Sequence, residues 1–242
     1  MTTDTVDDPG PGRAARFDHI VVLDTETTGR GPSADVVEIA WVVIDEHLEV
    51  LEEVSTLIDP GRPIPAEATE VHGITDEMVA GAPMFEAFMT DPASSPFGSG
   101  STLVIGHNVE FDYQHIEAYI ADGTTLCTLR LARYLFPVLG SHTLQTLVHH
   151  CRLGDVQTHR AAADVELTLR LARRMAADQG GSLDALLALS PVALAEMRVP
   201  FGDYRREPVR DLTAEQVAEI RDRYGERLGG DFAAALDLHH PQ

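Results

Sequence analysis

The apolar positions of the chain fall into short runs that predict a mixed α/β fold. Three early runs, at 20–23, 36–44 and 49–57, read as successive strands, and we expect them to form an antiparallel meander. Two later runs, at 102–106 and 126–128, supply further strands. Helical segments follow these runs, so we expect a sheet flanked by helices.

Helical periodicity dominates the second half of the chain. The expected helices cover 111–120, 143–151, 160–175, 182–197 and 213–227. A lead at 1–16, which contains Asp, Pro and Gly, is predicted to be disordered. Gly180 and Gly181 mark a boundary between a main domain at 17–180 and a small accessory C-terminal region at 181–242.

Two carboxylates, Asp24 and Glu26, stand at the end of the first apolar run. Side chains two apart on a strand point the same way, so both should project together from its carboxyl end. Adjacent anions repel unless a cation lies between them, and a hard divalent cation with oxygen ligands would meet that need. The alternative is a solvated strand end before a turn at Gly29, and this pair alone does not separate the two interpretations.

A second polar cluster follows the run at 102–106 and contains Asn108 and Asp112. These two residues are four apart, so they share a face if helical geometry begins early enough. Asp112 could then join Asp24 and Glu26 near the strand ends, where open α/β sheets place their sites.

A third cluster, with His159 and Asp164, opens a helix rich in Ala and Leu. Five helical residues turn the chain through roughly 500°, so the two side chains cannot share one face of a regular helix. We therefore expect His159 on the loop before the helix and Asp164 on the helix, facing the other carboxylates. A lone His at such a place is more often structural or exposed, but its position ahead of a fourth carboxylate favours a catalytic role.

The three clusters together resemble the exonuclease motifs of the DEDD superfamily, at 24–29, at Asn108 with 111–112, and at His159 with Asp164. The histidine in the last motif is typical of the DEDDh, DnaQ-like branch. The resemblance covers roughly residues 17 to 178. The chain is also similar to exodeoxyribonuclease X-type proteins. The segments that carry this second similarity are 127–137 and 201–205.

The resemblance implies a ribonuclease H-like fold and a metal-dependent 3′–5′ exonuclease that releases nucleoside 5′-monophosphates. It implies two Mg²⁺ or Mn²⁺ ions about 4 Å apart at the scissile phosphate. Asp24 would bridge both ions, Glu26 and Asp164 would hold the ion that activates water, and Asp112 would hold the other. His159 would take the proton from the attacking water.

The same resemblance indicates where the terminal nucleotide would bind. Backbone amides around Thr27 and Thr28 would receive the terminal 3′-OH, which would exclude internal cleavage. His72 and Phe111 would border the terminal nucleotide, although core or loop packing explains both residues at least as well. Asn108 of the second motif completes the expected substrate contacts.

The tail resembles a Phe-Gly-basic-Tyr-basic-Gly module that follows the catalytic domain in exodeoxyribonuclease X-type proteins. It departs from that pattern at Asp203, Arg206 and Glu207, which replace a basic residue, the Gly and a further basic residue. These changes argue against nucleic-acid binding by the tail. We therefore expect a chain ending near Gly180 to keep activity on short single strands.

The net charge of −21 limits the substrates that fit. All 18 basic residues are arginine. The strongly negative net charge argues against a protein that binds the phosphates of a long duplex. It is compatible with an enzyme that engages a few nucleotides at a strand end. A high-salt cytoplasm is a separate hypothesis for the acidity, and unchanged stability between low and molar KCl would exclude it.

Several other features bound the location and the function. No apolar run approaches the roughly 18 residues of a membrane span, and no signal peptide is recognised, so we expect a cytoplasmic protein without membrane contact.

Single-stranded DNA or frayed 3′ ends, in repair or turnover, are the leading substrates, with short RNA as an alternative. A third interpretation is a proofreading or scaffold subunit that binds a polymerase or a repair protein, but the intact carboxylates and His159 argue against a purely binding role.

Overall fold

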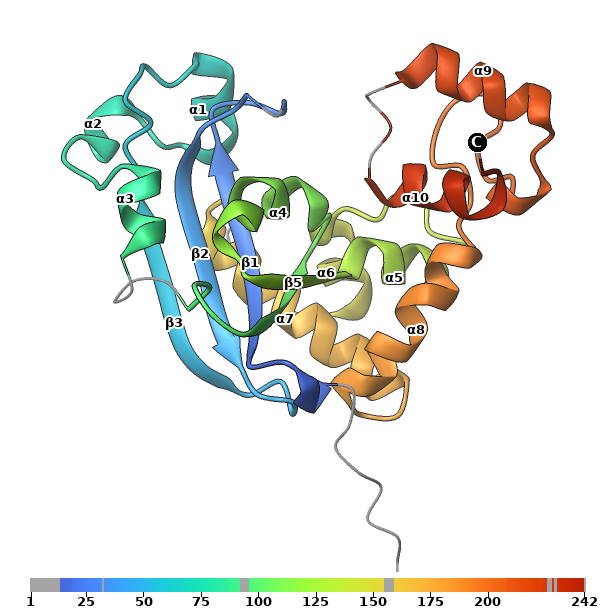
Figure 1. The fold of residues 1–242 in the computed structure, drawn as a ribbon, viewed down its shortest axis with the longest axis horizontal. Helices are drawn as coiled ribbons and strands as arrows, with labels where there is room; N and C mark the ends of the chain where they lie inside the picture. The colour runs from blue at the N-terminus through green and yellow to red at the C-terminus, as the bar shows by residue number, and fades with distance from the viewer. Residues whose placement is uncertain are drawn as a thin grey trace, which may run out of the picture.

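The computed structural model describes residues 14–31, 33–91, 96–154, 159–225, 228 and 230–241. Its centre is a five-stranded sheet in the order β3-β2-β1-β4-β5 (Figure 1). The strands are β1 (His19–Thr27), β2 (Val36–Ile44), β3 (Val50–Leu57), β4 (Ser101–Gly106) and β5 (Asp122–Cys127).

Strand β1 lies in the middle of the sheet, between one antiparallel and one parallel neighbour. It runs antiparallel to β2, which in turn runs antiparallel to β3. On its other side it runs parallel to β4, and β4 runs parallel to β5. The predicted mixed sheet, with an antiparallel meander and parallel strands, is therefore confirmed. Because β1 and β4 are parallel, the polar segments that follow them emerge at the same edge.

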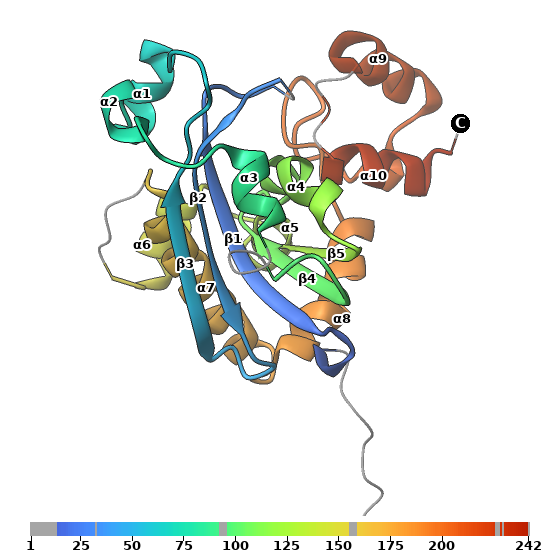
Figure 2. The same cartoon turned by 60° about the vertical axis from the view of Figure 1, so that its left-hand side comes forward.

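Helices cover both faces of the sheet (Figure 2). On one face, Ile20 and Val22 pack with Val165 and Leu169 of α7 (Ala161–Asp178). On the other face, Val21 and Leu23 share a core with α3 (Phe85–Thr90) and α4 (Glu110–Ile116). Successive residues of β1 thus point to opposite layers, as the pleat of a strand requires.

The remaining helices of the main domain are short. They are α1 (Ala66–His72), α2 (Asp76–Val79), α5 (Thr128–Leu135) and α6 (Leu144–Cys151). The helix predicted at 111–120 divides, because α4 ends at Ile116 and a 3-10 turn, η2 (Glu117–Tyr119), follows. Across the described part of the chain, no helix combines the length and apolar content that a membrane crossing needs.

The predicted disordered lead falls almost entirely outside the described residues. Its last three residues form a 3-10 turn, η1 (Ala14–Arg16), and the Ala14 amide donates a hydrogen bond of 2.6 Å to Asp184. This contact fixes the start of the described chain to α8 (Leu183–Ala195).

The C-terminal region forms a separate lobe beside the sheet (Figure 1). It contains η3 (Val209–Asp211), α9 (Ala214–Tyr224) and α10 (Gly230–His239), which enclose a small core of their own. The predicted C-terminal appendage is therefore confirmed. Its boundary at 180 stays a prediction, and α8 places Leu183 and Leu186 in the core of the main domain.

Candidate active site

Three of the predicted carboxylates meet at the carboxyl end of β1. Asp24 and Glu26 have the same parity on the strand as Val22, so they project toward α7. Carboxylate oxygens of Asp24, Glu26 and Asp164 all lie within 4.8 Å of one another. The fold therefore brings these three predicted residues together.

The start of α7 positions the third motif. Asp164 lies in the first turn of the helix, and its Oδ2 accepts a hydrogen bond of 3.1 Å from the backbone N–H of His159. His159 precedes the helix with a φ of 65°, and its side chain is exposed. The Oδ1 of Asp164 is buried and has no hydrogen-bond partner among the described residues. An unpartnered buried carboxylate oxygen needs a cation or a proton.

Asp112 reaches the cluster from the opposite layer. Its side chain is buried, and its Oδ1 accepts hydrogen bonds from the Thr25 amide at 2.9 Å and the Thr25 hydroxyl at 2.7 Å. Thr25 alternates with Asp24 and Glu26 along β1, so it faces α4 while they face α7. The strand thereby holds the fourth carboxylate beside the other three.

The electrostatics of the site call for positive charge. Burial, followed by the charge of Asp112, raises the pKa of Asp24 well above its ordinary value. Burial and the charge of Asp164 raise the pKa of Glu26 to about 8, and burial raises the pKa of Asp112 to about 7. Burial also raises the pKa of Asp164. Hard oxygen donors in this number suit divalent cations such as Mg²⁺ or Mn²⁺, so the residues present fit the metals that the resemblance implies.

Sequence reasoning missed the residue that fixes the start of α7. Glu38, buried in β2, accepts hydrogen bonds from Arg160 at 2.6 and 3.0 Å and from the Ala161 amide at 2.9 Å. A carboxylate that accepts from the first amide of a helix stabilises that helix end. Glu38 is the one carboxylate in the otherwise apolar run of β2, and that exception was the available signal.

Thr27 and Thr28, the residues predicted to contact the terminal 3′-OH, lie in a turn whose polar groups form hydrogen bonds with one another. The Thr27 hydroxyl donates to the Gly29 carbonyl at 2.6 Å. The Thr28 amide donates to the Asp35 carbonyl at 2.8 Å, and the Thr28 hydroxyl accepts from the Asp35 amide at 2.9 Å. The Thr28 amide therefore already has an acceptor within the turn.

The other predicted substrate residues lie at the end of α1, in the turn before α4 and in the first turn of α4. His72 is buried beside the Thr27 backbone, and its Nδ1 accepts from the Ile74 amide at 3.0 Å. Its Nε2 is buried with no partner among the described residues. Asn108 lies in the turn before α4 with a φ of 70°, so it is not on the helix. Phe111 is half-buried in the first turn of α4.

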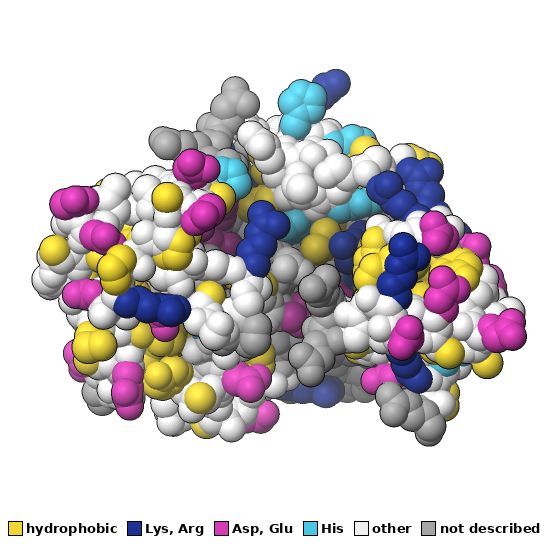
Figure 3. Space-filling model, turned by 90° about the horizontal axis from the view of Figure 1, so that it is seen from above, with side chains coloured by type: hydrophobic (Ala, Val, Ile, Leu, Met, Phe, Trp, Pro, Cys, Tyr) yellow, Lys and Arg dark blue, Asp and Glu magenta, His cyan; other side chains and the backbone are white. Residues whose placement is uncertain are grey.

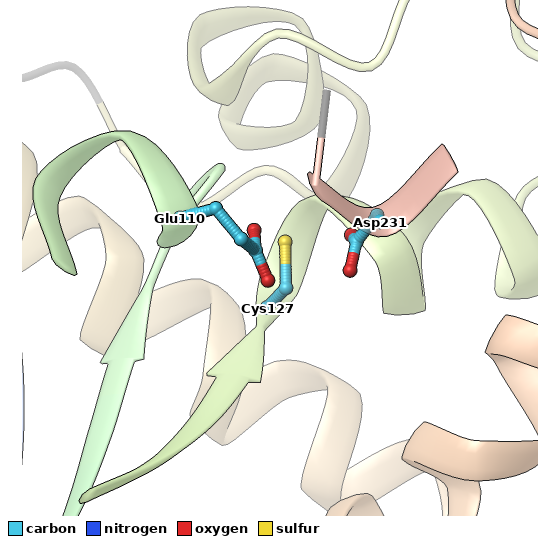
Figure 4. Close-up of side chains that lie close together, drawn as sticks. All are labelled: Glu110, Cys127 and Asp231. Carbon is cyan, nitrogen blue, oxygen red and sulfur yellow. The ribbon is translucent and has the colours of Figure 1, made fainter. Parts of the chain in front are cut away.

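A second cluster of metal-ligand types, Glu110, Cys127 and Asp231, lies at the contact between the main domain and α10 (Figure 4). Asp231 forms a buried ion pair with Arg130. Burial raises the pKa of the Cys127 thiol to about 12, so it stays protonated. Burial and the charge of Asp231 raise the pKa of Glu110. With an arginine already present and the thiol neutral, this cluster joins the two parts of the protein and does not resemble a metal site.

Comparison with known proteins agrees with this geometry. Residues 21–172 match the family described as RNase_T, exonuclease. The chain is 33% identical over 159 residues to DNA polymerase III subunit epsilon of Aquifex aeolicus, a match that covers 62% of this chain and 77% of that protein. It is also 33% identical over 165 residues to DNA polymerase III PolC-type of Listeria welshimeri, covering 65% of this chain. The match spans only 11% of that polymerase.

A solved structure of exonuclease X in complex with 5′ overhanging duplex DNA has the same fold. It shares 29% sequence identity with this chain at a TM-score of 0.56, and the match covers 72% of this chain and 99% of the other. The three motifs, the mixed sheet and these similarities lead to one conclusion: the chain belongs to the RNase_T exonuclease family and is of the DEDDh, DnaQ-like type with an exonuclease X-like resemblance.

Proposed function

We propose that this protein is a 3′–5′ exonuclease that acts on single-stranded DNA or frayed 3′ ends and releases nucleoside 5′-monophosphates. The observation that carries the proposal is the convergence of Asp24, Glu26 and Asp164 within 4.8 Å, beside buried Asp112. Asp24, Glu26, Asp164 and Asp112 would hold two Mg²⁺ or Mn²⁺ ions. Such ions, when bound, activate water and stabilise the charge that develops on the phosphate oxygens.

The chain's own residues supply positioning and proton transfer. The His159 side chain is exposed to solvent, and its backbone N–H donates to Asp164. It would accept the proton of the attacking water. Glu38 and Arg160 hold the turn that carries His159, and Thr25 holds Asp112. We assign 17–180 to this catalytic function and 181–242 to an accessory role, with 1–16 as a lead.

The choice of substrate rests on similarity. The exonuclease X structure holds a duplex with a 5′ overhang, in which the 3′ end is recessed. A recessed 3′ end is the kind of terminus that an enzyme of this type would shorten. Short RNA is the alternative substrate, because the four carboxylates would hold metals at a phosphodiester, a group that DNA and RNA share.

A polymerase-associated role is the second candidate. Two relatives are named as parts of DNA polymerase III, and in the PolC-type protein the matched segment is a small fraction of a long chain. A separate polymerase or repair protein could therefore bind this chain as a partner. The complete set of four carboxylates and His159 favours an active nuclease within such an assembly.

One experiment tests the proposal directly. The purified full chain is incubated with 5′-labelled DNA and RNA oligomers and Mn²⁺ or Mg²⁺, and products are resolved by length. We expect stepwise shortening from the 3′ end and loss of turnover in Asp24→Asn. An inert parent protein under both metals would contradict the nuclease proposal and favour a binding role.

A further inference from the structure

A cleft of about 750 Å³ lies between the main domain and the C-terminal region. One wall is α5 with the loop at 137–144, and the other is the segment at 196–206 that follows α8. Figure 3 looks onto this side of the molecule and shows arginine and histidine side chains along the hollow between the two parts. We call this hollow the arginine cleft.

Several arginines of the cleft form no ion pair with a carboxylate of the described residues. Most described arginines form an ion pair with a carboxylate, as Arg62, Arg170 and Arg223 do. Four of the arginines that line the cleft have no carboxylate within 4.0 Å among the described residues: Arg133, Arg198, Arg205 and Arg206. In a chain with a net charge of −21, unpaired positive charge on two facing walls is a specific feature. It favours a polyanion as the occupant.

The lining of the cleft includes the segment that leads into the helix of Asp112. His107 and Asn108, which follow β4 and precede the helix of Asp112, belong to its lining. Tyr134 also lines the cleft and is 37% exposed, so its ring is open to stacking. A basic groove with an exposed aromatic ring is how proteins bind single-stranded nucleic acid without reading its sequence.

Arg206 stands in a backbone conformation that favours glycine. Its φ is 75°, and its amide donates to the Val199 carbonyl at 2.8 Å. The module that the tail resembles has a glycine at this position, so an arginine here carries a cost in backbone strain. Arg205 donates to the Gly140 carbonyl at 3.3 Å, which joins this turn to the opposite wall of the cleft.

We propose that the arginine cleft binds the phosphates of the substrate strand on the 5′ side of the scissile bond. The proposal rests on the proposed nuclease function, and it assigns the C-terminal region a part in substrate binding. The occupant is a single strand of nucleic acid, several nucleotides long, whose 3′ end lies at the carboxylates. Short oligomers reach only the carboxylate site, whereas longer ones also reach Arg198, Arg205 and Arg206.

The test measures binding as a function of oligomer length. The full chain carrying Asp24→Asn, which prevents degradation, is titrated with fluorescent dT3 and dT12 in Ca²⁺, and anisotropy gives each Kd. Addition of Arg206→Gly is expected to weaken dT12 binding about tenfold, a change of about 1.4 kcal/mol, and dT3 binding much less. The slope of log K against log salt for dT12 should fall in magnitude by about 0.7, the value for one lost phosphate contact on a single strand.

Arg152→Gly is the matched control. Arg152 is also an exposed arginine with positive φ, at 56°, and it lies at the end of α6, outside the lining of the cleft. Both substitutions relieve backbone strain, so neither should lower the unfolding temperature. Of these two glycine variants, Arg206→Gly should weaken binding of dT12 and Arg152→Gly should not. Arg198→Ala, at another position in the cleft, should reproduce that length-dependent loss.

The outcomes separate the two proposals. Equal loss for dT3 and dT12, equal loss in Arg152→Gly, or no loss in both cleft variants would overturn strand binding in the cleft. None of these results depends on turnover, because binding is measured with the inactive chain. A parent protein that shortens oligomers but shows no length dependence would keep the nuclease function and remove the cleft from it.

Discussion

Glu38 in β2 and Arg160 before α7 form a bidentate pair across 122 residues of sequence, with hydrogen bonds of 2.6 and 3.0 Å. The same carboxylate accepts the Ala161 amide. A single buried side chain therefore sets the position of the turn that carries His159 and of the helix that carries Asp164.

Replacing Glu38 with Ala should weaken both stability and turnover. The Ala161 amide would lose its acceptor, which costs about 1–3 kcal/mol for a buried group. We expect lower stability in urea unfolding and a lower kcat, because α7 no longer has a fixed start. Glu166→Ala is the control, since its pair with Arg170 is exposed and worth about 0.5 kcal/mol or less. Full activity in Glu38→Ala would show that the pair does not position the site.

Asp24→Asn should abolish turnover while the fold stays intact. Asp24 lies among three other carboxylates, and burial with their repulsion raises its pKa well above the ordinary value. Removing one anion relieves that repulsion. Differential scanning calorimetry without metal should therefore show an equal or higher Tm. A protein that unfolds on this substitution would make Asp24 a structural residue.

Stability of the metal-free protein should fall as pH rises. The pKa of Glu26 is raised by burial from 4.5 to about 8, so the folded state favours the protonated form. A raised carboxylate pKa stabilises the fold fully below the unfolded value, and that contribution disappears as pH passes the folded value. We expect Tm in chelator to decrease between about pH 4.5 and 8. Mn²⁺ should restore it at the upper end, and Glu26→Gln should flatten the profile.

His159→Ala should separate proton transfer from metal binding. The His159 side chain is exposed, and its backbone N–H donates to Asp164. Loss of a general base lowers the rate by roughly two to four orders of magnitude, whereas metal affinity measured by calorimetry should stay nearly unchanged. His149→Ala, an exposed histidine on α6, should behave like the parent. A large fall in metal affinity would make His159 a ligand.

Chain shortening tests the boundary near Gly180. A chain ending at Gly180 lacks α8, so the partners of Leu183 and Leu186 in the main core become exposed. Loss of one buried leucine side chain commonly costs about 2–5 kcal/mol. We therefore expect this chain to unfold at a markedly lower temperature than one ending just after α8. Equal stability of the two would support the boundary at 180.

Local patterns were enough to predict the central strands and the shared direction of Asp24 and Glu26, whereas the full set of four carboxylates depended on the family resemblance. Val36–Ile44 is apolar along nearly its whole length, and the predicted strand has the observed bounds. Asp24 and Glu26 are two apart on one strand, so their shared direction follows from the pleat alone. The carboxylates of the other motifs come at strand and helix ends that a parallel sheet brings to one edge.

Contacts between distant segments could not be predicted in the same way. Two ion pairs, Glu38 with Arg160 and Arg130 with Asp231, join segments that are distant in the sequence. The periodicity of a single segment does not indicate which distant segment packs against it. The helices α1 and α2 span only 7 and 4 residues, too few for a helical period to stand out. The arginine cleft also escaped notice, because its walls come from segments that are far apart in sequence.

The hydrogen bonds from Thr25 to Asp112 affect how substitutions at this carboxylate should be understood. The amide and the hydroxyl of Thr25 both donate hydrogen bonds to one oxygen of Asp112. The Asp112 side chain therefore also holds α4 against the central strand. Alanine at this position would remove both the hydrogen-bond acceptor of Thr25 and the negative charge. Loss of activity in that variant would not separate a structural effect from a catalytic one. Asparagine keeps an oxygen that can accept from Thr25 while removing the charge. Asp112 is thus a carboxylate where an amide, and not a truncation, gives an interpretable result.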